Sequence, residues 1–557
     1  MKKRRPLPLL FLFALAAAAL ASPTLAQPSA SAGNPMADGG NAPTGYDMAP
    51  ETTLAVVQAA VAALPSKLPP GPFQPTWESL AAHYRVPAWF NDAKFGLFMH
   101  WGLYAVPAHH NEWYEKHMYA SMSAWHREHF GPQDKFGYKD FIPLFTADKF
   151  DPAAWAALFR KSGARFVIPT AQHHDNFALW DSAVTPFNAK RMGPHRDLIG
   201  ELAQAVRAEG LKFGVSNHGI ENFQFINPTP ALAAELKAKH ADLYDPQWAD
   251  FYHVADRSDA ACERFLVNWY ERNVELIDKY KPDILWFDNG VDQRYLDPLK
   301  LRIAAYYYNR AHEWGKAVSL STKKAAYAPS NRNTQTIGSI VDFEKIGSRS
   351  PSGIRPGAWQ VDEPIGSPSW GYTEGMTIAG PGTIVAKLAD TVSKNGTLLL
   401  NLSPKADGTI PQAQQDTLLA IGRWLDVNGE AIYGTHNWTR FRDELPDGRP
   451  AAADIRFTVK GDALYAILLG ARPGDRITIA SLARDSSPSA GSVSAVTMLG
   501  VPGTLAFTQD GSGLTVTLPA TAPCDYATTL KIVGLKLNPP TATRSGNPTD
   551  TPAQISP

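Results

Sequence analysis

The side chains best suited to chemistry follow four β-rich runs of the sequence. They are His100-Trp101, His173-His174-Asp175-Asn176, Ser216-Asn217-His218 and the aspartate of Trp286-Phe287-Asp288. Because side chains alternate along a strand, Phe98 should share a face with His100, and Trp286 should share one with Asp288. An aromatic ring and a polar group would then point together from two separate strands. That combination suits a sugar with one apolar edge.

Taken singly, each of these residues has an ordinary structural explanation. A carboxylate at the end of a strand often caps the next turn, and Asp288 precedes Asn289-Gly290, which is a typical turn pair. A lone histidine at a strand end is more often a hydrogen-bonded structural residue than a functional one. The functional interpretation therefore depends on whether the fold brings these residues together.

Between about Phe95 and Pro404, β-rich runs alternate with helical patterns, which predicts parallel strands joined by helices. The helices carry their own signals, such as the cap and first-turn proline of Asp151-Pro152 and the C-terminal stop at Gly163. The pattern predicts an α/β fold of the TIM-like (β/α)8 barrel type, in which chemistry sits where the strands end. The eight predicted strands are 95–101, 165–170, 212–217, 283–288, 317–321, 340–344, 358–361 and 397–402.

The pattern changes after a last helical stretch at about 412–427. Short strand-like runs follow, separated by Gly, Pro and Asp, and they predict a C-terminal antiparallel β-sandwich. These runs are 455–458, 463–469, 477–479, 497–499, 514–518 and 529–533. Such a domain could bind glycans, but structural support of the barrel is the interpretation that we favour.

The two ends of the chain differ in composition from its middle. The basic residues 2–5, the apolar run 9–21 and Thr24-Leu25-Ala26 are typical of a cleavable secretory signal, and the apolar run is short for a membrane span. We therefore expect a secreted or periplasmic protein without a membrane anchor. The predicted divisions are a signal peptide at 1–26, a linker at 27–74, the barrel at 75–436, the β-sandwich at 437–538 and a disordered tail at 539–557.

Composition narrows the classes of function. The 53 basic residues balance 53 acidic ones, so the sequence indicates no basic surface for a nucleic acid. A neutral ligand is the easier expectation, and 15 Trp, 19 Tyr and 25 Phe could supply faces on which sugar rings stack. Cys262 and Cys524 are too few for a disulfide scaffold.

An ordered set of motifs resembles one known family. The set comprises residues 89–102, Glu112-Trp113-Tyr114, His173-His174-Asp175-Asn176-Phe177, Arg196-Asp197-Leu198, Trp286-Phe287-Asp288, Ser369-Trp370-Gly371-Tyr372, residues 398–404 and residues 429–435. In this order they resemble the α-L-fucosidases of glycoside hydrolase family twenty-nine, over roughly residues 75–443. The resemblance implies hydrolysis of α-L-fucosides with retention of anomeric configuration, without a metal or other cofactor.

The resemblance also assigns roles to individual residues. The family's nucleophilic aspartate falls on Asp288. Phe98 and Trp286 match aromatic positions that receive the methyl group of the 6-deoxy sugar, but burying one methyl group is worth only about 0.8 kcal/mol. The polar contacts must therefore set most of the sugar specificity. Those contacts fall on His100, Glu112, Trp113, His173 and His174.

A retaining mechanism needs a second carboxyl group roughly 5 Å from the first. Glu344 ends the sixth predicted strand, where the family usually carries this acid, and Glu363 is the competitor; we favour Glu344. The chain lacks the family's common Thr-Pro-Glu context, and it has Ser216-Asn217-His218 where many relatives carry Tyr-Tyr-Ser. Lys323 or Lys324 could replace the substrate-binding arginine of the family.

The leading hypothesis is thus an exo-acting α-L-fucosidase whose substrates are fucosylated oligosaccharides or glycoconjugates. An enzymatic alternative acts on α-L-galactosides, which add a hydroxyl group at the apolar wall. Metal-dependent hydrolysis is disfavoured because the sequence has no His-Glu-x-x-His or paired Cys motif, and because adjacent histidines on a strand point to opposite faces. A non-catalytic fucose-binding protein is disfavoured because it would not need both Asp288 and Glu344.

Overall fold

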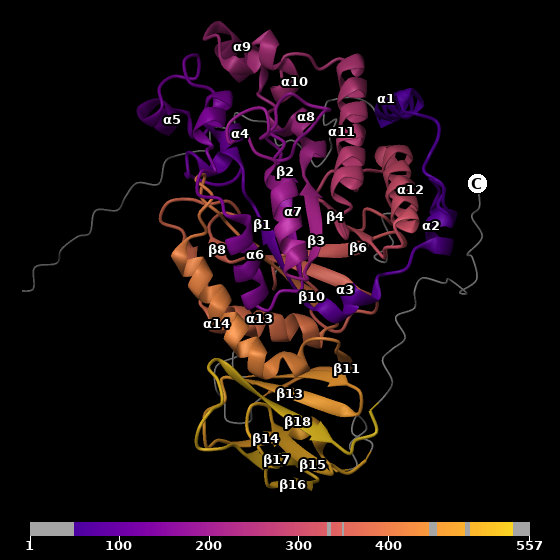
Figure 1. The fold of residues 1–557 in the computed structure, drawn as a ribbon, viewed down its shortest axis with the longest axis vertical. Helices are drawn as coiled ribbons and strands as arrows, with labels where there is room; N and C mark the ends of the chain where they lie inside the picture. The colour runs from indigo at the N-terminus through magenta and orange to yellow at the C-terminus, as the bar shows by residue number, and fades with distance from the viewer. Residues whose placement is uncertain (1–49, 331–335, 348–349, 445–453, 485–490, 538–557) are drawn as a thin grey trace, which may run out of the picture.

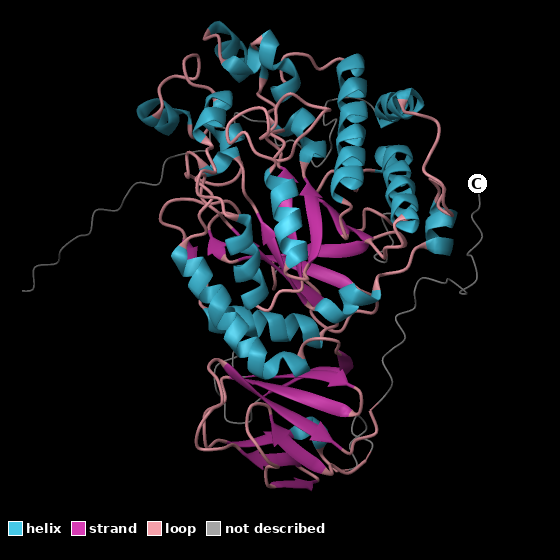
Figure 2. Ribbon diagram, viewed as in Figure 1, coloured by secondary structure: helices cyan, strands magenta, loops and turns pink. Residues whose placement is uncertain are grey.

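The computed structural model describes residues 50–330, 336–347, 350–444, 454–484 and 491–537 (Figure 1). These residues form a closed barrel surrounded by helices and, below it in Figures 1 and 2, a smaller β domain. The predicted signal peptide at 1–26 and the predicted tail at 539–557 lie outside the described residues. Among the described helices, none is both long and apolar enough to cross a membrane. Cys262 and Cys524 are free thiols.

Eight parallel strands close the barrel in the order β1-β10-β7-β6-β5-β4-β3-β2. All eight predicted runs are barrel strands, and no predicted end differs from the observed one by more than three residues. The prediction of a (β/α)8 barrel is therefore confirmed. The bounds are β1 Phe95–Met99, β2 Phe166–Gln172, β3 Lys212–Asn217, β4 Ile284–Phe287, β5 Ser319–Lys323, β6 Ile340–Glu344, β7 Trp359–Pro364 and β10 Gly396–Leu402, with β8 Gly366–Ser367 and β9 Thr377–Ile378 as a separate ribbon.

Helices form the outer layer around the barrel (Figure 2). The cap predicted for α6 is present, because Asp151 Oδ1 accepts a hydrogen bond from Ala154 N at 3.0 Å and Pro152 begins the helix. The helices are α1 Pro50–Ala63, α2 Trp77–His83, α3 Ala88–Ala93, α4 Tyr114–Met118, α5 Ser123–His129, α6 Pro152–Lys161, α7 Leu198–Ala208, α8 Asn222–Phe225, α9 Pro230–Ala238, α10 Ala249–Tyr252, α11 Asp259–Tyr280, α12 Asp297–Glu313, α13 Pro381–Ser393 and α14 Gln412–Asn428.

The predicted linker at 27–74 is wrong for its second half. There α1 packs against α11 and α12, with Val57 and Ala60 fully buried. Apolar residues at Val56, Ala60 and Leu64 recur at helical spacing and cover the outer helices. Residues 27–49 lie outside the described part of the chain.

The interior of the barrel is filled by side chains near the amino ends of the strands. Phe166 and Ile168 of β2, Ile284 of β4 and Leu399 of β10 are buried there together. Gly96 of β1 leaves room for the ring of Phe166, since a Cβ atom at position 96 would lie 2.3 Å from that ring. The barrel is therefore a packed core below its mouth, not a pore.

Gly96→Ala should destabilise the protein by about 1–3 kcal/mol, because overpacking a filled core forces neighbouring side chains out of their preferred rotamers. Thermal unfolding measures the effect. Gly353→Ala is the matched control, because a Cβ atom there would meet no atom within 4 Å. Equal melting temperatures for the two variants would contradict this packing of the barrel interior.

The C-terminal domain contains a five-stranded sheet in the order β11-β12-β13-β18-β15 and a three-stranded sheet in the order β14-β17-β16. The two sheets enclose a separate hydrophobic core, which confirms the predicted β-sandwich. β11 and β16 were not predicted. The bounds are β11 His436–Glu444, β12 Asp454–Lys460, β13 Ala463–Leu469, β14 Arg476–Ile479, β15 Ala495–Met498, β16 Phe507–Asp510, β17 Gly513–Thr517 and β18 Ala527–Val533.

The β-sandwich packs against the barrel through α13 and α14. Trp424 Nε1 of α14 donates a hydrogen bond to Ala527 O at 2.8 Å, and Arg456 Nε lies 2.9 Å from Asp390 Oδ1 of α13. Both side chains of the ion pair are at least four-fifths buried. These contacts support the interpretation of this domain as a structural support of the barrel.

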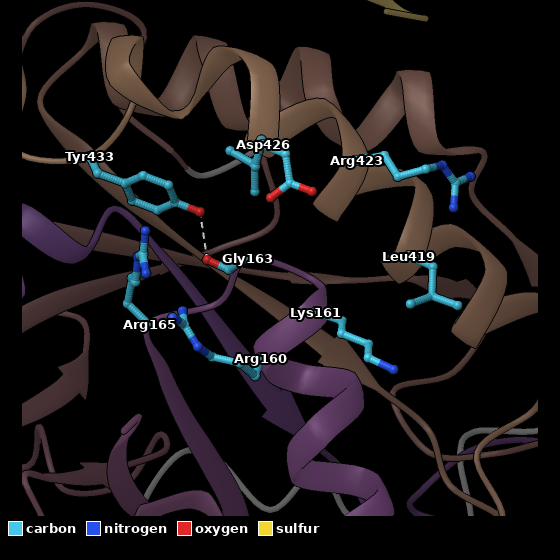
Figure 3. Close-up of a pocket in the computed structure, with 9 residues that line it drawn as sticks. Arg160, Lys161, Gly163, Arg165, Leu419, Arg423, Asp426 and Tyr433 are labelled. Carbon is cyan, nitrogen blue, oxygen red and sulfur yellow. Dashed lines mark hydrogen bonds between the residues drawn. The ribbon is translucent and has the colours of Figure 1, made fainter. Parts of the chain in front are cut away.

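A basic hollow between α6 and α14 lies at the amino end of β2, away from the mouth of the barrel (Figure 3). Tyr433 Oη donates a hydrogen bond to Gly163 O at 2.6 Å, and the guanidinium group of Arg165 lies 3.9 Å from the Tyr433 ring centroid. These contacts connect the residues just before β2 with the segment that leads into β11. The hollow contains none of the residues singled out for chemistry.

Candidate active site

Asp288 lies at the mouth of the barrel, directly after β4, and its side chain is 10% exposed. Its Oδ2 accepts a hydrogen bond from His218 Nδ1 at 3.0 Å, and its Oδ1 lies 3.5 Å from Lys323 Nζ. Burial alone would raise the pKa of Asp288, but the charge of Lys323 and the hydrogen bond from His218 outweigh burial and hold the pKa well below its usual value. Asp288 is therefore an ionised carboxylate bound by side chains of the site.

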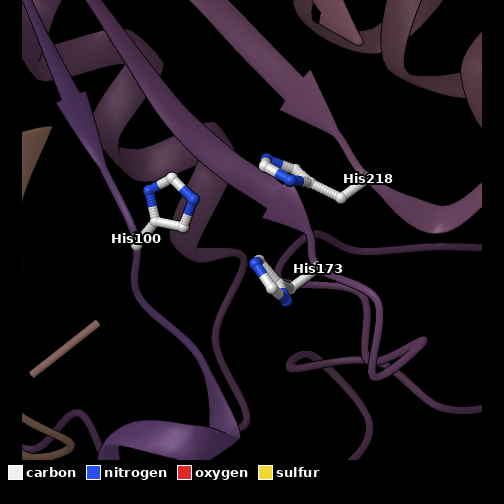
Figure 4. A group of neighbouring side chains, drawn as sticks. All are labelled: His100, His173 and His218. Carbon is white, nitrogen blue, oxygen red and sulfur yellow. The ribbon is translucent and has the colours of Figure 1, made fainter. Parts of the chain in front are cut away.

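Four histidines line the site beside this carboxylate. Figure 4 shows three of them, His100, His173 and His218, with their rings grouped together. One ring nitrogen of each lies within 4.8 Å of those of the other two. His100 Nδ1 lies 2.7 Å from Asn401 Oδ1, whereas the buried Nδ1 of His173 has no hydrogen-bond partner in the part of the chain that the structure describes. Burial lowers the pKa of His100 and His173 well below the usual value and that of His174 to about 3. These three rings are therefore neutral and can both donate to and accept from hydroxyl groups.

The convergence of the histidines corrects one step of the sequence interpretation. Strand alternation predicted opposite faces for His173 and His174, yet their ring centroids lie 4.4 Å apart. Both residues follow the end of β2 at Gln172, so alternation does not apply to them. Two groups of side chains could hold a metal ion, namely His100, His173 and His218, and His174, His218 and Asp288. Both ring nitrogens of His218 already have a hydrogen-bond partner, so a metal ion would displace one of them.

Aromatic rings form the floor of the site. The ring centroid of Phe98 lies 4.8 Å from that of His100 and 4.9 Å from that of Trp286, as predicted from two converging strands. Both Phe98 and Trp286 are 0% exposed, and the His218 ring lies over them. Phe98 and Trp286 therefore pack beneath the histidine rings of the site. They are not exposed to the pocket, where the resemblance implied that they would contact the methyl group of the sugar. The Trp370 ring, 5.3 Å from His100, lies nearer to solvent.

Lys323, at the end of β5, is a buried cation among three carboxyl groups. Its Nζ lies 3.5 Å from Asp288 Oδ1, 3.4 Å from Glu344 Oε2 and 3.3 Å from Asp362 Oδ2. Because both contacts share one nitrogen atom, the oxygens of Asp288 and Glu344 are at most about 7 Å apart. This upper limit is compatible with the spacing of roughly 5 Å used by retaining glycosidases. Burial would lower the pKa of Lys323, but these carboxyl groups, Asp362 foremost, raise it above its usual value.

Glu344 and Glu363 lie on opposite sides of the barrel wall. Glu344 ends β6 and reaches the interior cation Lys323, whereas Glu363 of β7 points towards the outer layer. There Glu363 Oε2 accepts a hydrogen bond from Ile346 N at 2.7 Å, and Oε1 pairs with Lys387 of α13. The structure therefore brings Glu344, and not Glu363, close to Asp288.

Glu112 and Trp113 lie at the rim, in the loop after β1. Glu112 Oε2 accepts hydrogen bonds from Ser369 Oγ at 2.9 Å and Trp370 N at 3.0 Å. Trp113 is 39% exposed, and its ring centroid lies 6.0 Å from that of His174. The structure thus gathers at one end of the barrel the nine residues to which the sequence analysis assigned a catalytic or substrate-binding role, namely Phe98, His100, Glu112, Trp113, His173, His174, Trp286, Asp288 and Glu344.

Two further carboxyl groups belong to the site although the sequence analysis gave them no role. Asp362 of β7 is fully buried, and burial raises its pKa well above the usual value despite the charge of Lys323. Glu221 Oε2 lies 3.5 Å from His174 Nδ1, and burial, followed by the charge of Asp288, raises the pKa of Glu221 to about 8. Their positions, at or just beyond the ends of predicted strands, were the signal that could have identified them.

Carboxylates, neutral histidines and aromatic rings at the carboxyl ends of a closed parallel barrel define a glycosidase-type (β/α)8 hydrolase. The family model for alpha-L-fucosidase matches residues 60–430, and the model for the alpha-L-fucosidase C-terminal domain matches residues 450–533. The chain is 32% identical over 504 residues to the tissue alpha-L-fucosidase of Rattus norvegicus, which covers 85% of this chain and 95% of the relative. It is 33% identical over 414 residues to the plasma alpha-L-fucosidase of Homo sapiens, with coverages of 71% and 79%.

Solved structures agree with this similarity. The alpha-fucosidase of Thermotoga maritima in complex with a mechanism-based inhibitor superposes with a TM-score of 0.66 at 33% identity, covering 83% of this chain and 100% of the other. The alpha-L-fucosidase isoenzyme 1 of Paenibacillus thiaminolyticus superposes with a TM-score of 0.59 at 26% identity, with coverages of 81% and 98%. The chain belongs to the α-L-fucosidase family and is a glycoside hydrolase.

Proposed function

We propose that this protein is an exo-acting, retaining α-L-fucosidase that releases terminal α-L-fucosyl residues from oligosaccharides or glycoconjugates. Membership of the family and the named activity of the relatives support the reaction. The observation that carries the mechanism is that Asp288 and Glu344 share one buried ammonium group, Lys323 Nζ, at 3.5 and 3.4 Å. We assign Asp288 as the nucleophile and Glu344 as the general acid and base.

In the first step, a carboxylate oxygen of Asp288 attacks the anomeric carbon. The bond from that carbon to the glycosidic oxygen breaks, and the leaving oxygen takes the proton of Glu344. The low pKa of Asp288 keeps the nucleophile ionised. Once Asp288 is esterified its charge is gone, so Lys323 can stabilise the carboxylate that Glu344 has become.

In the second step, Glu344 takes a proton from a water molecule whose oxygen attacks the same carbon. The ester bond to Asp288 breaks, and both carboxyl groups return to their starting states. Two inversions at one carbon give net retention. The same residue thus serves as acid and then as base, which requires it to remain beside Asp288 throughout.

Recognition of the sugar is assigned to the polar groups around the carboxylate. His173 Nδ1 is buried and has no hydrogen-bond partner among the residues described, and a sugar hydroxyl group could satisfy it. His100, His174 and Glu112 are positioned to add further hydrogen bonds, while the exposed ring of Trp113 offers a stacking face at the rim. These polar groups are mostly buried, as expected for a pocket that admits one terminal sugar.

Aryl α-L-fucosides and α-L-galactosides test the proposed activity. We expect kcat/KM to be at least about tenfold higher for the fucoside. The extra hydroxyl group of the galactoside would lose its water on entering the mostly buried pocket, at a cost of about 1–3 kcal/mol where no partner replaces that water, and burial of the fucoside methyl group gains about 0.8 kcal/mol. The rate of phenolate release is the measurement. Preference for the galactoside would instead support an α-L-galactosidase, and binding of fucose without any release would support a non-catalytic fucose-binding protein.

Export of the protein is also part of the proposal. The basic residues 2–5 and the apolar run 9–21 support a signal peptide that ends at Ala26. The mature protein, secreted or periplasmic, is then expected to begin at Gln27. Its N-terminal sequence after expression in a secreting host is the test, and retention of residues 1–26 would contradict it.

A further inference from the structure

His218 is the donor nearest to the proposed nucleophile, and it lies in the segment where the chain departs from the common Tyr-Tyr-Ser pattern. The residue is 0% exposed. Its Nδ1 lies 3.0 Å from Asp288 Oδ2, and its Nε2 lies 3.0 Å from Ser216 Oγ. The ring packs between those of Trp286, at 5.1 Å, and His173, at 4.8 Å. Both nitrogens and both faces of this imidazole are therefore held.

The direction of the hydrogen bond from His218 follows from its partner. An ionised carboxylate can only accept, so Nδ1 carries a proton and donates it to Asp288 Oδ2. The hydroxyl oxygen of Ser216 lies 3.0 Å from Nε2, and Ser216 donates a hydrogen bond to Thr170 Oγ1 at 3.3 Å, so the hydroxyl group beside the second ring nitrogen is itself fixed. His218 is thus oriented by the strand that precedes it.

The other neighbours of Asp288 do not replace this donor. His174 Nδ1 lies 3.1 Å from the carbonyl oxygen of His218 and donates its single proton there, so His174 Nε2 turns a lone pair towards Asp288 Oδ2 at 3.5 Å. Among the described residues, Oδ1 has longer contacts, to Asn289 Nδ2 at 3.4 Å and Lys323 Nζ at 3.5 Å. One carboxylate oxygen is therefore anchored by a short hydrogen bond and the other is held more loosely.

We propose that His218 is a positioning residue that anchors Oδ2 of Asp288, so that Oδ1 is the oxygen that attacks the anomeric carbon. The proposal rests on the proposed function. In the attack, Oδ1 bonds to the anomeric carbon while the glycosidic oxygen leaves with the proton of Glu344. Oδ2 becomes the carbonyl oxygen of the ester and keeps the hydrogen bond from His218. A donor at Oδ2 favours both the ionised state and the required orientation before attack.

Two variants at position 218 separate this role from simple packing. His218→Phe keeps an aromatic ring but removes the donor, and His218→Asn restores an N–H group near the place of Nδ1. For His218→Phe we expect kcat/KM on an aryl α-L-fucoside to fall by about 10- to 100-fold, the loss typical of one hydrogen bond to a charged group. The acid limb of its pH profile should move to higher pH, because Asp288 becomes easier to protonate. His218→Asn should recover at least half of the lost activity on a logarithmic scale.

Other titratable and charged groups also face Asp288 and His218, but they are the same in the wild type and in the variants. They are His100, His173, His174, Glu221, Lys323 and Asp362. A shift of the acid limb between these proteins therefore reports on the change at position 218. Ser216→Ala provides a second, smaller change that keeps the fold, and we expect it to lower kcat/KM by about 3- to 10-fold by loosening the ring. Melting temperatures show whether each variant is folded.

The outcomes are distinguishable. Wild-type protein that releases no phenolate from any aryl fucoside contradicts the proposed function itself. Active wild type, with a folded His218→Phe whose rate and acid limb are unchanged, contradicts only the role of His218. Equal losses in the Phe and Asn variants without movement of the acid limb also contradict it, because they indicate a packing effect. If neither variant at 218 folds, an unchanged rate in Ser216→Ala overturns the proposal and the expected fall supports it.

Discussion

Asp288→Gly is expected to abolish hydrolysis of aryl α-L-fucosides, with a loss on the order of 10⁴-fold or more in kcat. The carboxylate follows β4 at the mouth of the barrel and carries a low pKa, and its removal takes away the oxygen that would attack the anomeric carbon. The cavity left by glycine should admit azide. Added azide should restore turnover and give the glycosyl azide of inverted configuration, which nuclear magnetic resonance of the product identifies.

Asp292→Ala is the matched control for this variant. Asp292 lies four residues further along the same loop, and its Oδ2 is 3.2 Å from Lys324 Nζ. The substitution therefore removes a nearby carboxylate that does not contact Asp288. Its kcat should stay within a few-fold of the wild-type value. Substantial activity in Asp288→Gly without azide would exclude Asp288 as the nucleophile.

Glu344→Ala is expected to show a loss that depends on the leaving group. For a fucosylated oligosaccharide, whose alkoxide must be protonated as it leaves, kcat/KM should fall by about 10²- to 10⁴-fold. For an activated aryl fucoside the fall should be much smaller, because the phenolate needs little protonation. Rates over a series of aryl fucosides of rising phenol pKa measure this dependence directly.

Glu363→Gln distinguishes the two glutamates that the sequence left as alternatives. Glu363 is bound by Ile346 N and by Lys387 on the outer side of β7, so its loss should lower the melting temperature and leave the dependence on the leaving group unchanged. If the leaving-group signature appears in Glu363→Gln and not in Glu344→Ala, the assignment of the acid is wrong. If it appears in neither, Glu221, with its raised pKa and its contact to His174, becomes the candidate.

Most of the barrel could be predicted because β-rich runs alternate with helical patterns along the chain, and strands such as β1, β2, β4 and β10 are short, largely apolar runs. The bounds of β3 and β6 were predicted to the residue. α1 was missed because the burial of its apolar side chains depends on α11 and α12, which lie some 200 residues away in the chain. β11 and β16 were missed because their side chains are largely exposed and leave no continuous apolar run.

The directions of the site side chains could be predicted only where one strand determines them. Alternation along β1 correctly paired Phe98 with His100. It failed for His173 and His174, because both lie beyond the end of β2, where a loop sets their directions. The partners of Lys323 come from β4, β6 and β7, and no pattern within one strand reveals that a single ammonium group joins three carboxyl groups.

The most direct test of the mechanism is to trap the covalent intermediate. The wild-type protein is treated with 2-deoxy-2-fluoro-L-fucosyl fluoride, digested, and analysed by mass spectrometry. The proposed mechanism predicts time-dependent inactivation with one fluorofucosyl group esterified to Asp288. A label on Glu344, Glu221 or any other carboxyl group, or turnover of natural substrate with inversion and no label at all, would contradict it.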